Sequence, residues 1–416
     1  MADKQKFLLQ TIRKWIDEEQ LGKLDAALSE AQRRSPLPNR VLEGLALAAI
    51  EGGSDEALEI CLRHHPKAKD DQTLRMLCEE AAARECLGAC LLLVEAGLDP
   101  GARFLAFKGR IHAHQRNEEP GVAQPRLWAR PNRWSRQEEV SLLDWAIGRT
   151  KSADPSEEFA FVRELIERGG EMTPARWVAL WSSTGLDGLD LALEKGVDLL
   201  APHPLPGTRA VNGQPIFGNA LEAWLRSATK GELDGWRLAQ AGVDRMLPVG
   251  GPDLWKAADP RVASQPIHLL WHRAGVASQK AGASARLKKD EGEAAAAVES
   301  MMMWLLSQEA DSSEPDAHGR PVIHHAMSRF AADGEETYFL DEVTPLAKLA
   351  MSVCPIEWLK PHLERMEGHP DLATARGVFT QRERDELAES ASGLSFSGGS
   401  GAPEGGRKPK PGGRRL

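Results

Sequence analysis

Leu91-Leu92-Leu93-Val94-Glu95-Ala96-Gly97-Leu98-Asp99 is a leucine-rich segment that closes on glycine, an apolar residue and aspartate. The same ending recurs at Gly196-Val197-Asp198 and at Gly242-Val243-Asp244. A glycine directly after a run of helix-forming residues is typical of a helix C-terminus, because glycine adopts the left-handed conformation without strain. The recurrence therefore predicts a series of similar helices, each of which stops at its glycine.

A second phrase, in which proline precedes apolar residues, opens three of the helical patterns. It occurs at Gly213-Gln214-Pro215-Ile216-Phe217, Ser264-Gln265-Pro266-Ile267-His268 and Gly319-Arg320-Pro321-Val322-Ile323-His324. A turn, a short helix, a second helix and a glycine stop, repeated along a chain, predict helical hairpins stacked side by side. We therefore expect an all-α fold, a helical-hairpin solenoid with long inserted loops and helical caps.

Apolar residues at helical spacing run along most of the 416 residues. They predict an N-terminal helical cap at 1–37, a solenoid of about seven units at 38–354, a C-terminal helical cap at 355–391 and a disordered basic tail at 392–416. Within the solenoid, segments rich in Pro, Gly or charge predict inserted loops at 101–137, 201–211, 246–263 and 275–293. In repeat folds such loops tend to emerge on one face, which is often the binding face.

The repeated unit resembles the ankyrin repeat. The resemblance is carried by Gly319-Arg320-Pro321-Val322-Ile323-His324-His325-Ala326, with Asp316 three residues before that glycine, and more weakly by Ser141-Leu142-Leu143-Asp144-Trp145-Ala146 and by Pro266-Ile267-His268. It covers 38–354, although no unit has an intact Thr-Pro-Leu-His and the glycine stops are unevenly spaced. It implies ankyrin-like repeats in a non-catalytic protein-protein interaction module, with another helical-hairpin solenoid as the alternative.

The insertion at 101–137 is the strongest candidate for a contact surface. Between Arg103 and Arg136 it holds eight Lys or Arg side chains against two Glu, interleaved with Phe104, Phe107 and two Trp. Arginine forks onto carboxylate or phosphate, and tryptophan anchors in the pockets of a partner. We expect partner binding by Arg126, Trp128, Arg130, Arg133, Trp134 and Arg136. In the structural alternative, the two Trp cover an edge of the repeats and the arginines neutralise the acidic body.

Two histidines, His268 and His272, lie four residues apart, which places both imidazoles on one face of a helix. Leu269 stands where the metalloprotease motif needs Glu, so we interpret both histidines as structural. The sequence has no nucleophile elbow, phosphate-binding loop or dinucleotide-binding glycine motif. We therefore expect no enzymatic activity, and the alternative is an enzyme built on His268, His324 or His325.

Neither the cysteines nor the acidic run at 311–316 has the spacing of a metal site. Cys78, Cys86 and Cys90 are not arranged as in a zinc module, and we expect them to be buried as small apolar residues. The acidic run lacks the glycine and the terminal glutamate of an EF-hand loop, so we expect a solvated turn. Neither a metal nor a cofactor is predicted.

The net charge of −9 disfavours nucleic acid as a partner of the acidic body of the chain, although local basic patches stay open and RNA is an alternative partner of the insertion at 101–137. The expected partner is another protein, including one with an acidic surface. Five cysteines without a disulfide framework, no secretory signal and no membrane span predict a cytoplasmic protein, and the composition suits a bacterial one. The alternative is a secreted effector that captures a target protein in another cell. The sequence does not indicate the oligomeric state.

Overall fold

The structure is a computed structural model that describes part of the chain: residues 11, 14–16, 20–34, 37–65, 70–107, 137–150, 156–209, 215–227, 232–256, 265–288, 291–308, 310–312, 315–316, 320, 322–330, 336–339, 345–354, 356–365 and 372–395. It divides into two compact units, Met1–Pro206 and Gly207–Leu416. The described residues are mostly helical, which confirms the expected helical class. Among the described helices, none combines the length and the apolar character that a bilayer crossing needs.

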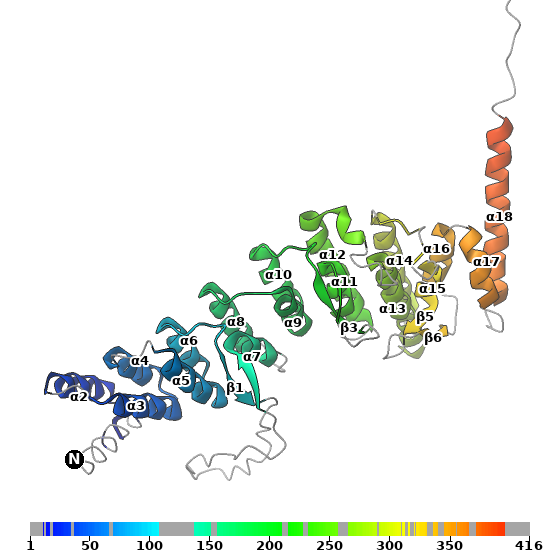
Figure 1. Cartoon of the computed structure of the whole chain (residues 1–416). Coiled ribbons are helices and arrows are strands. Elements are labelled where there is room, and N and C mark those ends of the chain that lie inside the picture. Colours follow the sequence, from blue (N-terminus) through cyan, green and yellow to red (C-terminus); the bar gives the residue numbers. More distant parts are fainter. Residues whose placement is uncertain are drawn as a thin grey trace, which may run out of the picture. The chain divides into compact units, whose positions relative to one another are not determined.

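The first unit consists of helical hairpins that stack in chain order. Its helices are α2 (Leu21–Arg34), α3 (Asn39–Gly52), α4 (Asp55–His64), α5 (Asp71–Ala83), α6 (Leu87–Glu95), α7 (Leu142–Arg149), α8 (Ser156–Glu167), α9 (Pro174–Thr184) and α10 (Leu186–Glu194). α3 pairs with α4, α5 with α6, α7 with α8 and α9 with α10, while α3 also contacts α5 and α7 also contacts α9. Figure 1 shows α3, α5, α7 and α9 along one side of this unit and α4, α6, α8 and α10 along the other.

The helix ends in the first unit follow the sequence signals. Ser54 caps α4, because its hydroxyl accepts a hydrogen bond from the Ala57 N–H at 3.3 Å. Gly97, Gly169 and Gly196 have positive φ angles of 115°, 94° and 71°. A side chain at these positions would be strained, so the prediction of glycine stops is confirmed at all three.

The second unit is arranged around α13. Its helices are α11 (Ala220–Ser227), α12 (Glu232–Gly250), the short 3-10 helix η2 (Pro252–Trp255), α13 (Pro266–Lys288), α14 (Glu291–Ser307), α15 (Val322–Met327), α16 (Pro345–Val353), α17 (Ile356–Arg365) and α18 (Leu372–Ser395). α13 contacts α11, α12, α14, α15 and α16, whereas α18 packs on α16 and α17. Figure 1 shows that α18 continues beyond the end of α17.

Two predictions about the second unit are wrong. Gly242 does not end a helix, since α12 continues through it to Gly250, and the expected loop at 246–263 therefore begins as helix. The expected loop at 275–293 is also largely helical, because α13 extends to Lys288 and α14 begins at Glu291.

Close packing explains why glycine occurs within α12 at position 242 and within α13 at position 275. A Cβ on Gly242 would lie 1.9 Å from Nε1 of Trp224, and a Cβ on Gly275 would lie 2.0 Å from the carbonyl oxygen of Ala326. Both distances are far shorter than a van der Waals contact, so glycine allows Trp224 to pack against α12 and α15 to pack against α13. In the sequence, a glycine that stops a helix and a glycine that admits a neighbour look alike.

Short strands and buried tryptophans complete the fold. The strands are β1 (Arg103–Phe107), β2 (Gln137–Ser141), β3 (His203–Arg209), β4 (Pro215–Gly218), β5 (Ser328–Phe330) and β6 (Glu336–Phe339), paired as β1-β2, β3-β4 and β5-β6. The side chains of Trp181, Trp224 and Trp271 are each 1% exposed. Tryptophan therefore fills space between helices, as expected from its high frequency in the sequence.

Candidate functional site

The insertion at 101–137 is attached to the first unit by a two-stranded stem formed by β1 and β2. The strands are antiparallel, with Arg103 opposite Ser141 and Phe107 opposite Gln137. Phe104 is only 3% exposed, and β1 contacts both α5 and α7. The stem is therefore anchored in the core of the unit, and it holds the two ends of the insertion side by side.

A hydrogen-bonded turn leads the chain from α6 into the stem. Oδ1 of Asp99 accepts a hydrogen bond from the Gly101 N–H at 2.8 Å. Asp198 plays the same part after α10, where its Oδ1 accepts from the N–H groups of Leu200 and Ala201 at 3.0 and 3.2 Å. In two of the three Gly-apolar-Asp endings the aspartate therefore closes a turn, as short polar side chains commonly do, whereas Asp244 lies within α12.

Arg176, Asp144 and Ser141 form a cluster at the base of the stem. Arg176 of α9 donates from Nε to Oδ1 of Asp144 at 2.7 Å and from Nη2 to Oδ2 at 2.9 Å. Nη2 of Arg176 also donates to the Ser141 hydroxyl at 3.0 Å, and that hydroxyl accepts the Asp144 N–H at 3.0 Å, which caps α7. The cluster thus joins the last residue of β2 to α7 and α9.

The cluster keeps the Asp144 carboxylate charged. The hydrogen bond from Arg176 lowers the pKa of Asp144, and a hydrogen bond from Ser141 adds to this effect, while burial opposes it. The pKa of Arg176 is raised, mainly by the same hydrogen bond. A fork of two charge-assisted hydrogen bonds fixes orientation as well as distance, so the base of the stem is held in one position.

We expect Arg176→Ala to lower the free energy of unfolding of the first unit by about 1 kcal/mol. The effect is modest because the Asp144 side chain is 45% exposed, so water replaces part of what is lost. Since the pKa of Asp144 is lowered in the folded protein, the stabilisation is present above the ordinary aspartate pKa of about 3.9 and is lost as the pH falls.

Urea denaturation at pH 7 and at acid pH measures this effect. Arg176→Lys keeps the charge but not the fork, and should recover only part of the stability. If Arg176→Ala unfolds at the same urea concentration as the wild type, the cluster does not stabilise the stem.

The residues predicted to bind a partner, Arg126, Trp128, Arg130, Arg133, Trp134 and Arg136, lie outside the described residues. One correction concerns the rest of that predicted surface. Phe104 is a buried anchor of the stem and is not available to a partner. Composition could not show this, because an aromatic side chain in a basic segment fits a core and an interface equally well.

In the second unit, His268 and His324 lie close to His325, and His325 pairs with the buried Asp316. The ring centroids of His268 and His325 are 4.8 Å apart, and those of His324 and His325 are 5.9 Å apart. Nε2 of His325 lies 3.1 Å from Oδ2 of Asp316, and Arg320 donates from Nε to Oδ2 at 2.7 Å and from its backbone N–H to Oδ1 at 2.9 Å. The side chains of Asp316 and His325 are both 0% exposed.

The prediction of a solvated turn at 311–316 is therefore wrong at Asp316. Burial favours the neutral form of the Asp316 carboxyl, but hydrogen bonds from His325 and Arg320 outweigh burial and hold its pKa well below the ordinary value. Burial lowers the pKa of His325, against the opposing effect of Asp316. At neutral pH the group is thus an ionised Asp316, a charged Arg320 and a neutral His325 that donates its Nε2 proton.

This arrangement supports the structural interpretation of the histidines. His268 is 0% exposed, and Nδ1 of His272 lies 3.3 Å from the backbone oxygen of His325, between α13 and α15. Within the part of the chain that the structure describes, no group of three or more His, Cys, Asp or Glu side chains is placed to hold a metal ion.

The prediction of buried cysteines is confirmed for Cys78 and Cys90 and is wrong for Cys86. Cys61, Cys78 and Cys90 are 0% exposed, whereas Cys86 is half-buried. Burial raises the pKa of Cys61 to about 12. A hydrogen bond with Cys78, followed by burial, raises the pKa of Cys90 well above its ordinary value. These buried thiols pack as small apolar groups, and the raised pKa values of Cys61 and Cys90 disfavour the reactive thiolate at those two positions.

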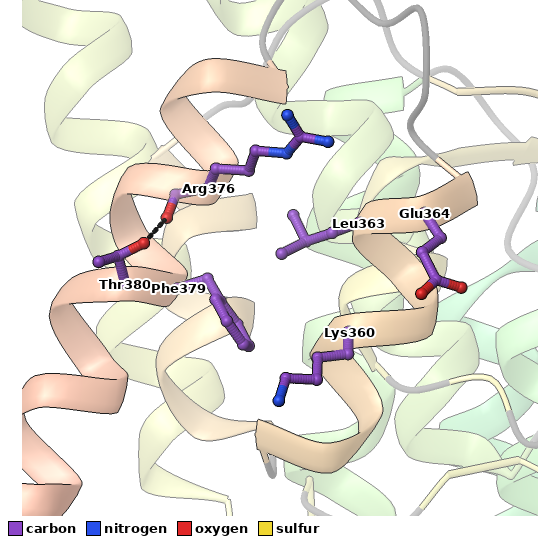
Figure 2. Close-up of a pocket in the computed structure, with 6 residues that line it drawn as sticks. All are labelled: Lys360, Leu363, Glu364, Arg376, Phe379 and Thr380. Atoms are coloured by element: carbon purple, nitrogen blue, oxygen red, sulfur yellow. Dashed lines mark hydrogen bonds between the residues drawn. The ribbon is translucent and has the colours of Figure 1, made fainter.

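A groove lies on the surface between α17 and α18, and no sequence pattern predicts it (Figure 2). It has a volume of about 420 Å³ and is lined by Lys360, Leu363, Glu364, Arg376, Phe379 and Thr380. These residues form no motif in the sequence, because they come from two helices that meet only in the folded unit.

No protein-family model matches the chain, and no curated protein is significantly similar to it. The resemblance to ankyrin repeats consequently depends on the residues quoted for it in this sequence.

Proposed function

We propose that the chain is a divergent ankyrin-like solenoid that binds another protein, without catalysis, through its inserted loops and the concave face of the repeat stack. The observation that carries the proposal is the stem of the 101–137 insertion. A loop that only connects α6 to α7 does not require paired strands, a buried Phe104 or a bidentate salt bridge between Arg176 and Asp144 at its base. An anchored base is what a binding loop requires, because it lowers the entropy lost when the loop is ordered on a partner.

The stacking within each unit supports the repeat part of the proposal. Four hairpins follow one another in the first unit, from α3 and α4 to α9 and α10, and each pair contacts the next through its helices or through β1. The same helix ending recurs in these hairpins: a glycine with a positive φ angle follows the helix, and Asp99 or Asp198 then closes a turn. Serial units that share buried faces are the defining feature of a solenoid.

The composition of the insertion indicates the chemistry of the partner. Between residues 103 and 136, eight basic and two acidic side chains give a net charge of 8 − 2 = +6. Such a segment is attracted to an acidic protein surface, and complementary charge mainly raises the association rate and the specificity. Arginine and tryptophan are also the residues that most often dominate the binding energy of an interface.

We expect simultaneous replacement of Arg126, Arg130, Arg133 and Arg136 by alanine to weaken partner binding about tenfold or more while the melting temperature hardly changes. Affinity capture with the intact chain identifies the partner, and titration of the purified partner then measures the affinity of each variant. A version that lacks residues 110–136, with the stem closed by a short glycine-serine link, should lose the partner altogether.

A matched control removes the same charge elsewhere in the first unit, by replacing Arg33, Arg34, Arg63 and Arg75 with alanine. These arginines are exposed and pair only along their own helices. The control should bind as the wild type does. Should the insertion variant instead melt several degrees lower and the affinity stay the same, the insertion has the structural role.

A further inference from the structure

The groove between α17 and α18 has no part in the proposed function and belongs to the second unit. Lys360, Leu363 and Glu364 line it from α17, and Arg376, Phe379 and Thr380 line it from α18. Its volume of about 420 Å³ falls within the range of about 300–1,000 Å³ that is typical of ligand sites. The groove is therefore large enough for one or two side chains of a bound segment.

The floor of the groove is apolar. Leu363 is 9% exposed, and the ring of Phe379 is half-buried. Figure 2 shows both side chains pointing into the space between the helices. An apolar side chain placed over them would remove apolar surface from water, which contributes roughly 25 cal/mol per Å².

The two cations that line the groove differ in whether a carboxylate pairs with them. Nζ of Lys360 lies 5.8 Å from the centroid of the Phe379 ring and 3.6 Å from the Glu383 carboxylate. Arg376 is exposed at the opposite end of the groove, and no salt bridge joins it to another described residue. Since Lys360 is paired with Glu383, Arg376 is the lining cation that has no carboxylate partner among the described residues.

Arg382 fixes the face that α18 turns toward the groove. Its Nη1 donates to the backbone oxygen of Met351 at 2.5 Å and to that of Cys354, at the end of α16. Ala375, one residue before Arg376, is 0% exposed. α18 is therefore held in one rotation, so that Arg376 and Phe379 are in position before anything binds, which reduces the cost of binding.

We propose that this groove binds a short segment of another protein that carries an apolar side chain beside a carboxylate. The apolar side chain lies over Leu363 and Phe379, and the carboxylate pairs with the guanidinium of Arg376, whose planar fork matches it. A basic residue placed at Arg376 is repelled by its guanidinium, and a bare inorganic anion leaves the apolar floor exposed. Charge and shape together favour an acidic peptide with Leu, Met or Phe.

The test is selection of a phage-displayed library of random dodecapeptides on the full chain, with counter-selection on Arg376→Glu. We expect enrichment of peptides in which Asp or Glu lies near Leu, Met or Phe. The enriched peptides are then synthesised with a fluorescent label, and their affinities are measured by fluorescence anisotropy. Arg376→Glu should weaken binding about tenfold or more, because attraction becomes repulsion.

Arg384→Glu is the matched control, since Arg384 is exposed on α18 but does not line the groove. It makes the same change of charge and should leave the affinity within about twofold. Phe379→Ala should weaken binding without any change of charge. Circular dichroism of each variant shows whether the helices are retained.

Several outcomes overturn the proposal: no enrichment, enrichment of basic peptides, or equal affinity for Arg376→Glu and the wild type. If sedimentation shows a concentration-dependent dimer that Arg376→Glu abolishes, the groove binds a second copy of this chain and the proposal of a different partner fails. The version that lacks 110–136 should select the same peptides, so failure of the groove and failure of the insertion are distinguishable.

Discussion

Gly275→Ala is expected to lower the free energy of unfolding of the second unit by about 3 kcal/mol, at the upper end of the usual range for overpacking. The added methyl carbon would lie 2.0 Å from the carbonyl oxygen of Ala326 and 2.7 Å from its carbonyl carbon. Both atoms belong to the backbone of α15, so rotation of a side chain cannot relieve the clash. α13 and α15 must separate, and separation opens the core around the central helix of this unit.

Gly377→Ala is the matched control for this prediction. Gly377 lies in α18 of the same unit, and a Cβ there would meet nothing within 4 Å. Alanine is the better helix former, so this variant should gain about 0.5–1 kcal/mol. Chemical denaturation of both variants measures the two changes. A Gly275→Ala protein as stable as the wild type would mean that α13 and α15 do not approach each other so closely.

Asp316→Ala is expected to cost about 3–5 kcal/mol, because it removes one partner of a buried ion pair. Arg320 then loses the carboxylate that it pairs with, and Nε2 of His325 loses its hydrogen bond to Asp316 in a site where the His325 side chain is 0% exposed. Asp316→Asn keeps an acceptor oxygen of similar shape and should recover part of the loss.

The lowered pKa values of Asp316 and His325 determine whether the free energy of unfolding rises or falls with pH. The folded pKa of Asp316 is lowered, so its contribution is full above about pH 3.9 and is lost as the pH falls toward the folded value. The folded pKa of His325 is also lowered, so stability decreases as the pH falls through about 6.5. The wild type therefore loses stability on acidification, and its advantage over Asp316→Ala narrows below about pH 4. A constant difference across this range would contradict the role of the Asp316 charge.

Much of the local structure in the first unit was predictable, because the signals act within one helix. Ser54 caps its own helix, and Gly97, Gly169 and Gly196 adopt positive φ angles directly after theirs. Such signals depend on backbone geometry over a few residues. They need no knowledge of which helices become neighbours.

The errors arose where a neighbour decided the role of a residue. The sequence predicts a helix end at Gly242 and a loop that begins at Gly275, although each glycine lies within a helix and admits another element, Trp224 in one case and the α15 backbone in the other. Asp316 was expected to be solvated, although Arg320 and His325 pair with it in the core. The groove between α17 and α18 had no counterpart in the sequence, since its six lining residues lie on two helices.

The sequence by itself determined that this protein is mostly helical, that helices of the first unit stop at Gly97 and Gly196, and that one insertion carries a dense set of arginine and tryptophan residues. These properties follow from helix periodicity, capping and composition, which act along the chain. Only the tertiary structure decided that this insertion has an anchored stem, that His325 and Arg320 pair with a buried carboxylate and that α17 and α18 enclose a groove. The physical reason is that burial, charge pairing and shape depend on atoms brought together by packing, and a linear pattern does not specify those neighbours.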